Sequence, residues 1–108
     1  MELAFSTKAL RAVCESEERA LRELGVDLAS ILKRRLADLR AAANATDLVA
    51  GNPKPAPDSK EELMLDLADG FTVFLTANHA AIPRLRSGHI DWSNVSRVKL
   101  LRIEKHNG

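Results

Sequence analysis

The chain has 108 residues, of which 45% are hydrophobic, so its size and apolar content fit one globular domain spanning residues 1–108. Its 16 basic and 15 acidic residues give a net charge of +1, which excludes a general electrostatic attraction to nucleic acid. A single cysteine excludes an internal disulfide, and no stretch approaches the ~18 consecutive apolar residues of a membrane span. Because residues 1–5 also lack the layout of a signal peptide, we expect a cytoplasmic protein that does not enter a membrane.

The first half of the chain predicts a short strand followed by two amphipathic helices. In residues 2–5, Leu3 and Phe5 alternate with Glu2 and Ala4, which is typical of a strand. Ser6 or Thr7 can cap a helix that ends at Gly25, and a second helix begins near Asp27. Apolar residues recur at steps of three and four, at Leu10, Val13, Cys14, Leu21 and Leu24 in the first helix and at Leu28, Ile31, Leu32, Leu36 and Leu39 in the second. We expect a helical hairpin in which Cys14 is a buried apolar side chain and not a nucleophile.

A change of pattern follows at residues 51–59, whose three prolines predict a loop. Residues 63–67 and 71–77 then alternate or are rich in β-formers, and Asp69-Gly70 between them is typical of a tight hairpin turn. Residues 78–94 are expected to form an irregular excursion.

The last predicted strand, residues 95–104, has an interrupted alternation. Val98 and Leu100 share one face, but Leu101 and Ile103 fall on the other, which indicates a bulge or burial on both faces. Together the elements predict an α+β fold, in which an N-terminal strand and a helical hairpin pack on a small, mainly antiparallel sheet.

Basic residues gather in the last quarter of the chain, where only Asp91 and Glu104 oppose them. They are Arg84, Arg86, Arg97, Lys99, Arg102 and Lys105, and they are our candidates for RNA binding. Arg97 and Lys99 share a strand face, so they can line a groove for RNA, or they can simply protect an edge strand from further pairing. His79 and His89 lie on the excursion beside Trp92, for which we favour a packing role.

Three residues are candidates for catalysis: Lys54, Lys60 and His106. A lysine can hold phosphate as a point charge, and an imidazole with a pKa near ~6.5 can take up or release a proton. Solvated loop lysines and a solvated tail histidine are the alternative. The three histidines lack the spacing of metal ligands, and no glycine-rich phosphate loop occurs, so we expect no metal and no other cofactor.

Segments in a fixed order along the whole chain resemble the RelE/ParE superfamily of toxins, within it the HigB-like killer-protein group. They are residues 5–11 with Cys14-Glu15, residues 36–42 with Asp47-Leu48, residues 51–53, residues 65–71 and residues 90–95. The resemblance implies a cytoplasmic toxin that cleaves mRNA on the ribosome without a metal. It also implies a cognate antitoxin as partner, often a helix-turn-helix DNA-binding protein.

The chain departs from that family at positions that carry chemistry. Relatives commonly have an arginine after the aromatic residue of the second hairpin, where this chain has Thr72 after Phe71. Lys54-Pro55 stands where they commonly carry His-Pro-Leu, and the chain has no tyrosine. Two alternatives therefore stay open: a catalytically weakened or inactive RelE-fold protein that only binds the antitoxin, and a ParE-like gyrase inhibitor.

Overall fold

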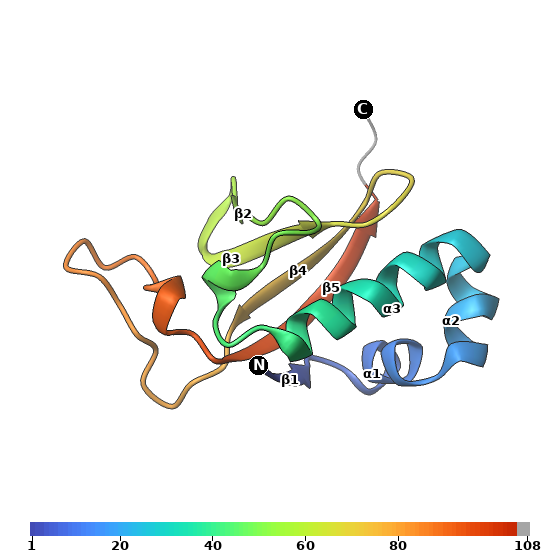
Figure 1. Cartoon of the computed structure of the whole chain (residues 1–108), viewed down its shortest axis with the longest axis horizontal. Coiled ribbons are helices and arrows are strands. Elements are labelled where there is room, and N and C mark those ends of the chain that lie inside the picture. Colours follow the sequence, from blue (N-terminus) through green and yellow to red (C-terminus); the bar gives the residue numbers. More distant parts are fainter. Residues whose placement is uncertain (106–108) are drawn as a thin grey trace.

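A mixed five-stranded sheet with the strand order β1-β5-β4-β3-β2 organises the fold (Figure 1). The computed structural model describes residues 1–105, and the strands are β1 (Glu2–Phe5), β2 (Lys54–Ala56), β3 (Ser59–Asp66), β4 (Phe71–Ala77) and β5 (Arg97–Lys105). Neighbouring strands are antiparallel except β1 and β5, which run parallel. The mainly antiparallel α+β fold expected from the sequence is confirmed.

Three helices, α1 (Lys8–Glu15), α2 (Glu17–Leu24) and α3 (Val26–Ala41), precede the rest of the sheet. The prediction of one helix up to Gly25 is wrong, because Ser16 has an extended backbone with φ −121° and ψ 115°. Its side chain accepts a hydrogen bond from the Arg19 amide at 3.2 Å, so this residue ends α1 and caps α2. The second predicted helix corresponds to α3.

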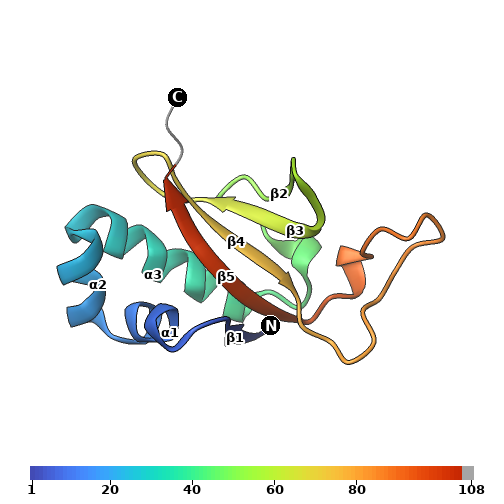
Figure 2. The ribbon, with the colours of Figure 1, turned by 180° about the vertical axis from the view of Figure 1, so that it is seen from behind.

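The core lies between α3 and one face of the sheet. Leu32, Leu36 and Leu39 of α3 are buried in one cluster with strand residues Leu63, Leu65, Val73, Leu75, Val98 and Leu100. Alternation along the strands turns their other side chains to the opposite face, over which no helix passes in Figure 2. This second face carries only a small apolar cluster, formed by Ala56, Met64 and Phe74 with Leu101 packed against it.

Two local features set the register of the long strands. Asp69 and Gly70 have φ values of 57° and 78°, so the β3–β4 turn uses the left-handed region that a tight hairpin requires. On β5, Leu100 pairs with Leu75 but Arg102 pairs with Phe74, which leaves Leu101 as the extra residue of a β-bulge. The bulge turns Leu101 and Arg102 to the same face as Lys99.

The segment 51–59 is not entirely a loop, because β2 pairs with β3 at its centre. Pro55 is tolerated there since β2 is an edge strand, where a missing amide costs no inner hydrogen bond. Residues 78–96 form the expected excursion, an arm that extends beyond the sheet in Figure 1. Its base is closed by His79, whose Nε2 accepts hydrogen bonds from the Ser96 and Arg97 amides at 3.1 and 3.3 Å.

Candidate functional site

The face of the sheet opposite the helices, called the open face below, holds several of the predicted site residues. We define it by Lys54, Lys60, Glu62, Met64, Phe74, Lys99, Leu101, Arg102 and Glu104, which alternation or pairing places on this side. Lys54 pairs with Met64, Met64 with Phe74, and Phe74 with Arg102, so these residues form one row across four strands. Residues distant in sequence are thereby held on one rigid surface.

Arg102 lies on the open face, and its side chain is paired with two carboxylates. Its guanidinium contacts Glu62 at 2.8 Å and Glu104 at 2.7 Å, and it lies 4.2 Å from the centroid of the Phe74 ring. The hydrogen bond that Arg102 donates to Glu62 is the main cause that raises the pKa of Arg102 above its ordinary value. A phosphate at this position would have to compete with two carboxylates for the same donors.

Three lysines lie on the same face of the sheet as this cluster. Lys54 on β2 and Lys60 on β3 are exposed, and Lys99 on β5 is half-buried beside Thr76, its partner on β4. Within residues 1–105 none of these lysines takes part in an ion pair, so their ammonium groups are available to an anionic ligand. The open face therefore combines one arginine that is paired with two glutamates, a cluster of net negative charge, with three lysines that have no ion-pair partner.

The arm carries the next two candidates. The Arg84 guanidinium donates to both carboxylate oxygens of Glu61 at 3.0 and 2.6 Å and to the Gly88 carbonyl at 2.9 Å. This bidentate pair ties the arm to β3, and the hydrogen bond from Arg84 lowers the pKa of Glu61. Arg86 is exposed at the tip of the arm next to the exposed Leu85.

The remaining strand candidates lie at the two ends of β5. Arg97 pairs with Glu2 at 3.0 Å, where β1 and β5 begin together. Lys105 is opposite Phe71 and lies 5.7 Å from its ring, on the face that β5 turns toward the helices. The structure thus separates Lys105 from the open face. His106 lies outside the described residues, so its predicted role has no structural counterpart.

Among the titratable side chains of residues 1–105, no group of three or more His, Cys, Asp or Glu is placed to hold a metal ion. None of the helices in this part of the chain has the length and apolar character needed to cross a membrane.

Cys14 is half-buried, and desolvation raises the pKa of its thiol to about 11, so it is protonated at neutral pH.

Sequence reasoning missed the partners of Arg102 on the open face. Glu62 is 40 positions away along the chain, so only strand register brings the two together. It also missed that Leu21, expected in an apolar core stripe, is 48% exposed.

Comparisons of the chain with models of protein families, with curated proteins and with solved structures find no match.

Proposed function

We propose that this protein is the toxin of a toxin–antitoxin pair and acts in the cytoplasm by engaging mRNA on the ribosome. The observation that supports this best is the open face, which carries Lys54, Lys60 and Lys99 on the same side of the sheet as Phe74 and Arg102. Unpaired cations on one face can bind a polyanionic backbone, and positioned cations also stabilise the extra charge of a phosphoryl transition state.

Each group has a defined part in this proposal. Lys54, Lys60 and Lys99 bind phosphates, with Arg84, Arg86, Arg97 and Arg102 steering the strand along the sheet and arm. His106, from the end of the chain, serves as general acid or base in cleavage next to a 2′-hydroxyl. A cognate antitoxin, in this family often a helix-turn-helix protein, neutralises the toxin by binding it.

Induced expression tests this function. We expect translation arrest together with mRNA cuts that map within codons, and we expect substitution of Lys54, Lys60 and Lys99 by Ala to abolish both. Lys8→Ala is the control for each of these lysine substitutions made singly, because Lys8 is an exposed lysine at the start of α1, which lies on the helix side of the sheet. Intact mRNA and normal growth on expression of the folded protein would contradict the proposal.

A second candidate is a RelE-fold protein that binds the antitoxin but has lost cleavage. It is favoured by the ion pairs that occupy Arg84, Arg97 and Arg102, and by Thr72, which is only 3% exposed and offers no cation to a phosphate. In that case the adjacent gene product copurifies with the protein, while the lysine substitutions leave growth unchanged. DNA breaks on expression, with mRNA intact, would instead indicate a gyrase inhibitor.

A further inference from the structure

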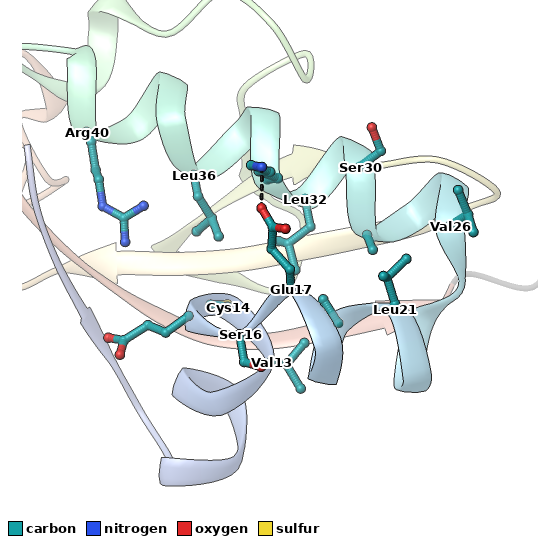
Figure 3. A pocket seen from close by; sticks show the side chains of 14 residues that line it. Val13, Cys14, Ser16, Glu17, Leu21, Val26, Ser30, Leu32, Leu36 and Arg40 are labelled. Atoms are coloured by element: carbon teal, nitrogen blue, oxygen red, sulfur yellow. Dashed lines mark hydrogen bonds and ion pairs between the residues drawn. The ribbon is translucent and has the colours of Figure 1, made fainter.

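An apolar groove of about 530 Å³ lies between α1, α2 and α3, away from the open face (Figure 3). Its walls are formed by Val13, Cys14, Ala20, Leu21, Val26, Ala29, Leu32 and Leu36. Leu21 and Val26 are 48% and 71% exposed, so the apolar lining continues to the surface at one end. This volume falls in the range of about 300–1,000 Å³ that is typical of sites for small molecules.

Most of the charged side chains that line the groove are in ion pairs. Glu17 of α2 and Lys33 of α3 form an ion pair across it, drawn as the dashed line in Figure 3, and Glu15 pairs with Arg11 at 3.4 Å. Arg40 also lines the groove, yet it makes no ion pair or side-chain hydrogen bond within residues 1–105. It is therefore the one charged lining residue of the described chain whose charge is not balanced by a partner.

Arg40 lies at the other end of the groove from Val26. Figure 3 shows its side chain reaching from α3 into the space beside Cys14, and its positive charge acts on that thiol. A guanidinium binds a carboxylate through two parallel hydrogen bonds, which fixes the orientation of a ligand as well as its charge. An anionic group here would leave an attached apolar chain along Leu36, Leu32 and Ala29.

We propose that the groove binds a free aliphatic carboxylate, with its carboxylate on Arg40 and its hydrocarbon chain directed toward Val26. The lining suits both parts of this ligand: the apolar walls accommodate a hydrocarbon, and the exposed guanidinium of Arg40, which has no acidic partner within residues 1–105, can bind an anion. The site lies on the helix side of the sheet, so the proposal is independent of RNA binding by the open face.

Decanoate, below its micelle concentration, is the probe. We expect it to saturate a single site on the full chain, shifting the amide resonances of α1, α2 and α3. We also expect it to slow alkylation of Cys14, the only cysteine of the protein. Decanol, which has the same chain without the charge, is expected to bind about tenfold or more weakly.

Two substitutions separate the polar and apolar parts. Arg40→Gln is expected to weaken decanoate about tenfold or more while leaving decanol unchanged. Val26→Glu, at an exposed position of the apolar end, is expected to weaken both ligands. Arg34→Gln is the control, because Arg34 is an exposed arginine of α3 that does not line the groove.

Three results would overturn the proposal. The first is equal decanoate affinity in the parent chain and in a folded Arg40→Gln variant. The second is unchanged Cys14 alkylation at saturating decanoate. The third is binding of phosphatidylglycerol vesicles or of an amphipathic helical peptide in the groove without binding of monomeric decanoate, which would make it a docking surface for a macromolecule.

Discussion

Arg102 illustrates how a side chain with a suitable charge can be withheld from a ligand by its neighbours. Glu62 and Glu104 both contact it, and its planar group lies over Phe74. The pairs are partly exposed, with 41% of the Arg102 side chain accessible, so they contribute only about 1 kcal/mol to stability. Their larger effect is on the electrostatic potential of the open face.

Removing the two carboxylates is therefore expected to strengthen RNA binding. In Glu62→Gln/Glu104→Gln, the freed Arg102 can contact a phosphate, and the dependence of log K on log salt steepens by about one contact. The measurement is a salt titration with single-stranded RNA. Glu18→Gln/Glu23→Gln carries the same charge change on α2, and an equal effect in this control would mean that net charge alone is responsible.

The Arg84–Glu61 pair gives a prediction for pH. The hydrogen bond from Arg84 holds the pKa of Glu61 below 4.5, so the carboxylate is favoured by folding. The stabilising effect is present above pH 4.5 and is lost as the pH falls through the lower, folded-state pKa. NMR titration of the Glu61 carboxyl should show this lowered midpoint, and Arg84→Gln should return it toward 4.5; an unchanged midpoint would show that the pair does not persist in solution.

At the scale of elements, regular patterns were sufficient to predict α3, β4 and the β3–β4 turn. The stripe of leucines in α3 and the Asp69-Gly70 turn are local signals, and local chemistry decides them. The break at Ser16 was missed because serine is tolerated inside a helix, and only the observed backbone reveals that it caps α2 instead. Strand β2 was missed because its proline is allowed only at a sheet edge, which the sequence does not identify.

The candidate site could be predicted only in part. The basic residues of β5 are visible in the sequence, but their faces depend on the bulge at Leu101. Without that bulge, alternation would turn Arg102 to the core face and away from Lys99. The ion pairs across the sheet depend on register, and register is a property of the assembled strands that no single segment determines.

Two glycines allow a matched test of a contact between elements. Gly51 and Gly88 have φ values of 88° and 90°, so alanine at either position meets the same backbone strain of about 1–2 kcal/mol. A Cβ at Gly51 would also lie 2.8 Å from Arg35 Nε, whereas one at Gly88 would meet nothing within 4 Å. Arg35 joins α3 to β3 through the Asp66 carbonyl at 3.2 Å.

We therefore expect Gly51→Ala to lower the free energy of unfolding by about 1 kcal/mol more than Gly88→Ala. Urea denaturation of the two variants measures the difference. Equal losses would mean that the Arg35 side chain and the Asp66 carbonyl, 3.3 Å from the same Cβ, adjust at no measurable cost.

On the scale of the whole molecule, β5 holds the sheet together. It pairs with β1 on one side and β4 on the other, and Val98 and Leu100 at its centre are fully buried. By contrast, β2 has three residues and pairs only with β3. Stability within the sheet is therefore expected to decrease from β5 toward β2.

Native-state hydrogen exchange measures this gradient directly. The paired amides of β4 and β5 are expected to exchange only through global unfolding, and those of β2 through local opening with a smaller free energy. A denaturant series that gave β2 and β5 the same exchange free energy would show instead that the sheet opens as a single cooperative unit.

The parallel pairing of β1 with β5 has a consequence for the time at which the protein folds during its synthesis. Glu2 pairs with Arg97, and the Ser6 hydroxyl donates to the Leu101 carbonyl at 2.6 Å across 95 positions of chain. Closing so large a loop is slow, and it is impossible until β5 has left the ribosome. A partly made chain lacks the pairings of β5 with β1 and β4, so the five-stranded sheet and its surface can be completed only after Arg97–Lys105 has emerged from the ribosome.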